Sequence, residues 1–162
     1  VLVHGAGRAV AVTMSTTLAA FADAGTTLTG SSGDDTIYGG AFTDTLYGNN
    51  GNDWLIGGGG DDVMDGGAGN DLYVIAQAGD VVMEFGGFGD DVAFVSTNGW
   101  TAPEHLETAV LTDAATQLAG GAGAQILIGN AALASTLSGG AGNDTLVSAA
   151  LGDTLAGGAG DD

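Results

Sequence analysis

The stretch GNNGNDWLIGGGGDDVMDGGAGNDLYV, residues 48–74, consists of three successive nine-residue segments that share one pattern. Each segment begins with glycine, has aspartate at its sixth position and has a large apolar or aromatic residue at its eighth. Glycine loses more conformational freedom on folding than any other residue. A stretch so rich in glycine therefore needs a strong additional constraint to hold it in one conformation.

The same nine-residue pattern continues on both sides of this stretch. Five in-phase segments cover residues 30–74, and five more, one of them ten residues long, cover 120–162. In the second set Gln125 replaces the sixth-position aspartate of the first segment, and the second segment has no acidic residue. The last segment stops after six residues, which we interpret as truncation of a longer chain. The sixth-position aspartates are Asp35, Asp44, Asp53, Asp62, Asp71, Asp144, Asp153 and Asp162.

A period of nine with a short apolar piece predicts an all-β solenoid. Each repeat supplies a strand of about three residues and a six-residue turn, so that two repeats, 18 residues, close one coil. Successive coils then stack as parallel strands about 4.8 Å apart. The eighth position points into a thin core and the seventh and ninth point outward. The glycine content is too high for a helix.

The charge balance is extreme. The chain has 20 acidic residues, a single basic residue, Arg8, and a formal net charge of −19. This excludes binding to nucleic acid and opposes contact with anionic membranes. Two carboxylates about 5 Å apart repel by roughly 3 kcal/mol at an effective dielectric constant of about 20. Because the chain lacks compensating bases, we expect metal cations to neutralise it. No stretch is long and apolar enough to span a membrane.

The spacing also brings aspartates together. Turns on one side of a solenoid belong to repeats two apart, so we expect Asp53 to neighbour both Asp35 and Asp71. The same argument pairs Asp44 with Asp62, and Asp144 with Asp162. Carboxylate and carbonyl oxygens converging in this way suit Ca²⁺, which takes six to eight oxygens at about 2.3–2.6 Å, better than Mg²⁺. An isolated aspartate is more simply a solvated turn residue, but five in phase favour a metal.

The segments GGGGDDVMD, GGAGNDLYV and GGAGNDTLV match G-G-x-G-x-D-x-U-x position by position. This is the calcium-binding repeat of the RTX (repeats-in-toxin) family, which the chain resembles over 30–74 and 120–162. The resemblance implies a right-handed parallel β-roll that folds on Ca²⁺ outside the cell, and export by type I secretion. It also implies fourth-position glycines in the calcium-binding turns, here Gly33, Gly51, Gly60, Gly69, Gly142 and Gly160.

The expected sites are not equal in strength. Phe42 stands where a fourth-position glycine belongs, and a positive φ there would be strained. This weakens the Asp44 site. Asp153 faces the turn without acids and has Leu151 at its fourth position, so we expect no strong calcium binding there. Asp80, Asp90 and Asp91 lie outside the repeats, and we expect them to be solvated.

The chain therefore divides into an N-terminal segment (1–27), a first β-roll block (28–74), an irregular connecting β segment (75–118) and a second, truncated block (119–162). We expect strands in the connecting segment at 81–85, 92–96 and 106–111. Its His105 and Glu107 lack a third partner and do not indicate catalysis.

The outward positions of the first block are unusually apolar at Trp54, Ile56, Leu72 and Val74. Residues 75–118 could cover them, or they could contact another copy or domain. The leading functional hypothesis is a calcium-binding structural, assembly or secretion module of a secreted or cell-surface protein. The alternatives are the non-catalytic C-terminal module of a secreted protease, lipase or epimerase, and an adhesin that binds glycan through Tyr38, Tyr47 and Trp54.

Overall fold

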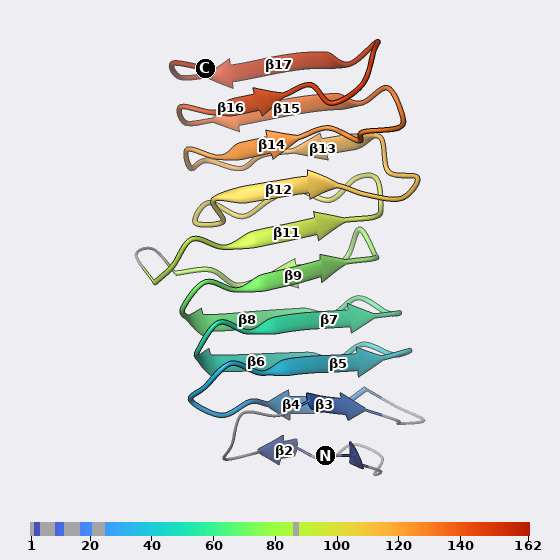
Figure 1. Ribbon diagram of the computed structural model, residues 1–162, viewed down its shortest axis with the longest axis vertical. Coiled ribbons are helices and arrows are strands. Elements are labelled where there is room, and N and C mark those ends of the chain that lie inside the picture. Colours follow the sequence, from blue (N-terminus) through green and yellow to red (C-terminus); the bar gives the residue numbers. More distant parts are fainter. Residues whose placement is uncertain (1, 4–8, 12–16, 21–24, 86–87) are drawn as a thin grey trace.

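The computed structural model describes residues 2–3, 9–11, 17–20, 25–85 and 88–162. In these residues the chain forms only strands, turns and bends. It winds as a β-solenoid that rises coil by coil from the N-terminus to the C-terminus (Figure 1). None of the described residues belongs to a helix long and apolar enough to cross a membrane.

The strands form three parallel sheets. The long sheet has nine strands in the order β1-β3-β5-β7-β9-β11-β12-β14-β16. A five-stranded sheet has the order β10-β8-β6-β4-β2, and a three-stranded sheet has the order β13-β15-β17. The strands of the long sheet are β1 (Leu2–Val3), β3 (Thr17–Ala20), β5 (Thr36–Gly40), β7 (Trp54–Gly58), β9 (Leu72–Ile75), β11 (Val92–Val95), β12 (Thr108–Leu111), β14 (Ile126–Ile128) and β16 (Thr145–Val147). The other two sheets contain β2 (Ala9–Ala11), β4 (Thr27–Thr29), β6 (Thr45–Asn50), β8 (Val63–Ala68) and β10 (Val81–Val82), and β13 (Gln117–Ala119), β15 (Thr136–Ala141) and β17 (Thr154–Ala159).

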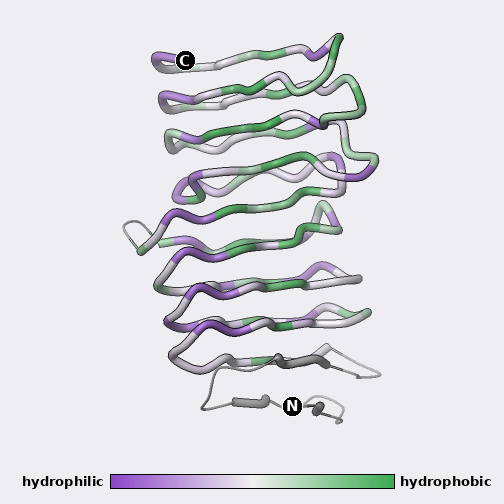
Figure 2. Tube along the Cα trace, in the orientation of Figure 1, coloured by the Kyte–Doolittle hydropathy of each residue, from purple (hydrophilic) through white to green (hydrophobic). Residues whose placement is uncertain are grey.

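The strand register follows the sequence repeat. Ile37 of β5 pairs with Leu55 of β7, and Leu46 of β6 pairs with Met64 of β8, each 18 residues further along the chain. The eighth-position residues of the first block therefore stack inside the coils and are fully buried, whereas Leu146 is partly buried and Leu155 in the last coil is 44% exposed. Burying one such side chain stabilises the fold by about 1.5–3 kcal/mol. In Figure 2 the hydrophobic colour follows the strands, and hydrophilic residues gather in many of the turns. The parallel β-roll predicted from the repeat is confirmed.

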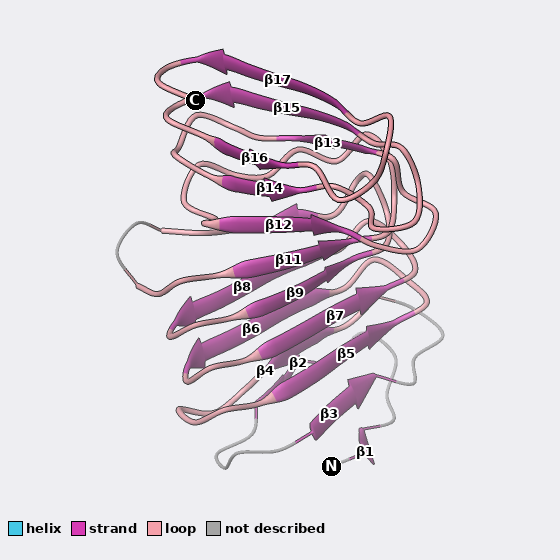
Figure 3. Cartoon of the chain, turned by 45° about the horizontal axis from the view of Figure 1, so that its top comes forward, coloured by secondary structure: helices cyan, strands magenta, loops and turns pink. Residues whose placement is uncertain are grey.

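The segment 75–118 lies within the same solenoid. β11 pairs with β9 on one side and with β12 on the other, and β12 pairs with β14. Figure 3 shows these strands side by side in the long sheet, with loops at its two edges. The expected strands in this segment exist with shorter bounds. Because the segment extends the sheet, Trp54 on the outward face remains 44% exposed.

Candidate metal centre

The sixth-position aspartates form hydrogen-bonded ladders along the solenoid. Oδ1 of Asp53 accepts a hydrogen bond of 2.7 Å from the backbone N–H of Asp35, and Oδ1 of Asp71 accepts one of 2.7 Å from that of Asp53. On the other side Oδ1 of Asp62 accepts from the N–H of Asp44, also at 2.7 Å. Each carboxylate thus lies one coil from the next, as the 18-residue spacing predicts.

The second carboxylate oxygen in these ladders lacks a partner. Among the described residues, five Oδ2 atoms are buried and accept no hydrogen bond. Leaving a buried acceptor unsatisfied costs about 1–3 kcal/mol, and more for a charged group. The only Lys or Arg of the chain, Arg8, lies outside the described residues. A cation from solution can therefore satisfy these atoms, which belong to Asp44, Asp53, Asp62, Asp71 and Asp144.

First-position glycines leave room around these oxygens. A Cβ at Gly48 would approach Oδ2 of Asp53 closer than 3.0 Å and lie 2.5 Å from the carbonyl oxygen of Gly66. Gly39 is similar, with Oδ2 of Asp44 at 2.8 Å from the Cβ position. Oxygens from two successive coils therefore converge on a space that any side chain would fill. A mixed set of carboxylate and carbonyl oxygens is the kind that Ca²⁺ prefers.

The fourth-position glycines have the backbone conformation that the repeat predicts in most turns. Their φ angles are 119° at Gly51, 104° at Gly60, 131° at Gly69, 119° at Gly142 and 145° at Gly160. L-residues with side chains rarely adopt this region. At Gly51 and Gly69 the backbones of successive turns also approach so closely that a Cβ would collide with the neighbouring turn.

The turn of residues 30–35 differs from that expectation. Gly33 is not among the residues with positive φ. The physical reason is Ser31, whose Oγ accepts the Gly33 N–H at 3.2 Å. The N–H and Oγ of Ser31 also donate to Oδ2 of Asp35 at 2.6 and 2.9 Å. The second oxygen of Asp35 is thus held by its own turn.

The turn of residues 39–44 avoids the strain expected at Phe42. Phe42 does not have positive φ, and its side chain is 44% exposed. Gly40, at the second position, has a φ of 127°. This turn therefore has positive φ at its second position but not at its fourth. Oδ2 of Asp44 still has no hydrogen-bond partner.

In the C-terminal turns, Asp144 and Asp162 continue the aspartate ladder, whereas the side chains of Gln125 and Asp153 are hydrogen-bonded within the protein. Oδ1 of Asp162 accepts the N–H of Asp144 at 2.9 Å, and Oδ1 of Asp144 accepts the N–H of Gln125 at 2.9 Å. The Gln125 side chain is occupied, because its Nε2 donates to the carbonyl of Pro103 at 2.7 Å. Asp153 accepts bonds at both oxygens, from the Ser135 N–H on Oδ1 and from three donors in residues 148–150 on Oδ2.

Burial and hydrogen bonding shift the carboxylate pKa values in opposite directions. Burial raises the pKa of Asp53 to about 7, although the hydrogen bond from the Asp35 N–H lowers it. Burial likewise raises the pKa values of Asp62 and Asp71 to about 6. At Asp153 the hydrogen bonds, first that from Ser135, hold the pKa down to about 2. A bound cation favours the charged form of a carboxylate and would reverse the upward shifts.

Two acidic residues expected to be solvated are buried, so that expectation was wrong. Asp80 and Asp91 are 4% and 3% exposed. Oδ1 of Asp80 accepts the N–H of Asp62 at 3.0 Å, and Oδ1 of Asp91 accepts that of Asp71 at 2.8 Å. For Asp80 the missed signal is IAQAGDVVM, residues 75–83, which continues the phase of nine but lacks glycine at its first and fourth positions. For Asp91 it is GGFGDDVAF, residues 86–94, a complete repeat displaced from that phase by two residues. Asp90, in contrast, is exposed as expected.

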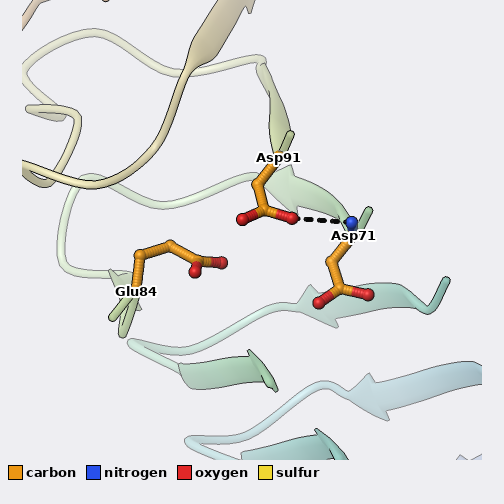
Figure 4. Close-up of side chains that lie close together, drawn as sticks. All are labelled: Asp71, Glu84 and Asp91. Carbon is orange, nitrogen blue, oxygen red and sulfur yellow. Dashed lines mark hydrogen bonds between the residues drawn. The ribbon is translucent and has the colours of Figure 1, made fainter. Parts of the chain in front are cut away.

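A third carboxylate joins Asp71 and Asp91. One ligand atom from each of Asp71, Glu84 and Asp91 lies within 4.8 Å of the others. Figure 4 shows the three carboxylates turned toward one another, with Asp91 bonded to the backbone nitrogen of Asp71. Burial and the neighbouring carboxylates raise the pKa of Glu84. Glu84 lies outside the nine-residue pattern and could not be found by it.

A parallel solenoid with oxygen-lined glycine turns defines a β-roll with cation-binding turns. The family model of the RTX calcium-binding nonapeptide repeat matches four copies, at residues 22–41, 38–73, 134–150 and 148–162, together half of the chain. The chain therefore belongs to the RTX calcium-binding repeat family, and its cofactor is Ca²⁺. No curated protein and no solved structure matches the chain.

Proposed function

We propose that this chain is a structural module of a secreted or cell-surface protein and that it folds when Ca²⁺ enters its turns. The observation that carries the proposal is the set of five buried carboxylate oxygens without partners, which recur in phase with the coils. Each lies in a described part of the chain that contains no Lys or Arg. Calcium is the counter-charge that the fold requires.

Among the sites built only from repeat residues, the strongest lie where two turns with first- and fourth-position glycines are stacked. One is between the turns of residues 48–53 and 66–71, with Asp53 and Asp71 as carboxylate ligands. Another is between 139–144 and 157–162, with Asp144 and Asp162. The turn of residues 57–62 pairs Asp62 with Asp44 in a weaker site, because the turn of residues 39–44 lacks the fourth-position glycine.

Calcium binding makes folding of the chain depend on whether it is inside or outside the cell. The unfolded chain has no preformed site, so the free energy of binding becomes free energy of folding. A site at 100 times its Kd contributes about 2.7 kcal/mol. Extracellular calcium modules have Kd values of about 10⁻⁴–10⁻³ M. Such sites fill outside the cell and stay empty in the cytosol, which supports export as an unfolded chain.

A calcium titration followed by far-ultraviolet circular dichroism tests this function. We expect little β structure in EDTA and a cooperative gain of β signal as Ca²⁺ is added. Mg²⁺ at the same concentration is the control and should be much less effective, because it demands stricter geometry and gives up its waters reluctantly. A full β spectrum in EDTA would contradict the proposal.

Assembly through the outward face of the long sheet is a second candidate role. Tyr38 of β5 and Trp54 of β7 are 39% and 44% exposed on neighbouring strands. Tyr47 lies on β6 in the other sheet, so the three aromatic residues do not form one glycan platform. We expect Trp54→Ser to lower the molar mass measured by light scattering in calcium. An unchanged mass would remove this role.

A further inference from the structure

We propose that Glu84 joins Asp71 and Asp91 in a three-carboxylate calcium site that differs from the two-carboxylate sites elsewhere in the roll. The inference rests on the proposed calcium-dependent function and adds a ligand from outside the nine-residue repeat. It also predicts which site of the roll binds calcium most tightly.

The position of Glu84 follows from the end of the five-stranded sheet. β10 is an edge strand of that sheet and pairs only with β8 among the described strands. The Met83 N–H still donates to the carbonyl of Met64 at 2.8 Å, which anchors the chain beside the preceding coil. Glu84 follows directly, in the segment between β10 and β11. The two residues Glu84 and Phe85 are the insertion that shifts the repeat phase.

An unpartnered buried atom points into this cluster. Asp71 is 1% exposed, and its Oδ1 is used by the Asp53 N–H. Its Oδ2 has no hydrogen-bond partner. A Cβ placed on Gly66 would lie closer than 3.0 Å to both this Oδ2 and the hydroxyl of Tyr73. The same hydroxyl donates to Oε1 of Glu84, so Oδ2 of Asp71 faces the side of the turn where Glu84 lies.

Tyr73 fixes the orientation of Glu84. Its side chain is fully buried, and its hydroxyl accepts the Gly66 N–H at 2.8 Å. The single proton of that hydroxyl is then directed to Glu84. Asp91 is oriented by the Asp71 N–H. Since Oδ1 of Asp71 accepts the Asp53 N–H, hydrogen bonds hold all three carboxylates in place before any ion binds.

The charge of the cluster calls for a divalent cation. Three carboxylates meet at one point, and the described residues contain no Lys or Arg to neutralise them. Calcium affinity rises with the number of charged ligands. This site should therefore fill at a lower calcium concentration than the others. Because each coil of a solenoid contacts only its neighbours, the first site to fill can start folding that spreads in both directions.

Isothermal titration calorimetry on the full chain tests the proposal with Glu84→Gln. Glutamine keeps an oxygen for Tyr73 and removes only the charge. We expect the tightest calcium site to weaken by at least about tenfold, with the other sites unchanged. Glu104→Gln is the matched control, because Glu104 is exposed and lies outside the cluster, and its isotherm should superimpose on that of the wild type.

The outcomes separate this inference from the proposed function. A wild-type chain that binds no calcium overturns both. A wild-type chain that binds calcium, with an unchanged Glu84→Gln isotherm, overturns only the three-carboxylate site. Anomalous scattering from wild-type crystals soaked in Tb³⁺ gives a second answer that does not depend on the folding of a variant. A peak between Asp71, Glu84 and Asp91 supports the site, and peaks confined to other turns refute it.

Discussion

The turns that end at Asp53 and at Asp153 place the same residue at the same position of the repeat, yet the two carboxylates are in opposite states. In GNNGND, residues 48–53, Oδ2 of Asp53 has no partner, and burial raises its pKa to about 7. In SAALGD, residues 148–153, Oδ2 of Asp153 accepts bonds from Ser148, Ala149 and Ala150, and its pKa is about 2.

The difference comes from the backbone of the turn. In the glycine turn the second and fourth residues, Asn49 and Gly51, both have positive φ, at 82° and 119°. This conformation leaves Oδ2 of Asp53 without an N–H donor. In the turn of residues 148–153, two backbone N–H groups and the Ser148 hydroxyl donate hydrogen bonds to Oδ2 of Asp153. These donors stabilise its negative charge without a cation. A sixth-position aspartate therefore requires calcium only when its own turn supplies no N–H or hydroxyl donor to its Oδ2 atom.

The largest effect that should separate the two kinds of turn is loss of the Asp71 charge. Asp71→Asn alters two stacked sites, because Asp71 lies between Asp53 and Asp91. We expect a loss of about 3–5 kcal/mol of unfolding free energy in saturating calcium, since each site contributes about 2.7 kcal/mol at 100 times its Kd. Denaturant unfolding with and without calcium measures this.

Asp153→Asn is the matched control for that measurement. It should change the calcium-dependent part of the stability very little, because both oxygens of Asp153 are already bonded within the protein. An equal loss of calcium dependence in both variants would show that the turn backbone does not distinguish the sites.

A methyl group on the turn backbone should have a smaller effect. Gly69→Ala forces a side chain into a φ of 131° and against the carbonyl of Gly51. We expect a cost of about 1–3 kcal/mol, together with weaker calcium binding, measured by thermal unfolding in calcium. Gly59→Ala is the control, because its nearest neighbour, the carbonyl oxygen of Ala41, lies at an ordinary 3.5 Å. Similar melting temperatures for the two variants would contradict this account.

Acidification should have the smallest of these effects, a gradual fall in calcium affinity at the glycine turns. Protons compete with calcium at Asp53, Asp62 and Asp71, whose pKa values are about 6 to 7. The raised pKa values mean that the calcium-free roll loses stability as pH rises from the unfolded pKa of about 4 to these folded values, whereas the calcium-bound roll gains stability over the same range. We expect calcium affinity to fall by about tenfold for each competing proton and pH unit below these values, measured by calorimetry at several pH values.

Asp153 should play no part in that pH dependence. Its pKa is lowered, so its contribution to stability is present above the unfolded value of about 4 and is lost only as pH falls toward 2. A calcium affinity that stays constant between about pH 7.5 and 5.5 would argue against proton competition at the glycine turns.

The repeat was sufficient to predict the coil and most of the ladders. The nine-residue period gives the register that aligns Ile37 with Leu55, because a parallel coil places equivalent positions side by side. It does not reveal Asp80, because the in-phase segment IAQAGDVVM (75–83) lacks the first- and fourth-position glycines. It does not reveal Asp91, because the inserted Glu84 and Phe85 break the phase that the pattern depends on. It also misjudges Gly33, which has no positive φ because Ser31, two residues earlier, holds that turn by hydrogen bonds.

The sequence by itself determined that this chain is a glycine-turned β-roll whose acidic residues need calcium, because both the 18-residue coil and the lack of basic residues are properties of the chain alone. The tertiary structure decided which carboxylate oxygens remain without a donor, since that depends on the backbone path of each turn. It also decided that Glu84 meets Asp71 and Asp91. Residues from different coils come within ligand distance only after the chain has wound upon itself.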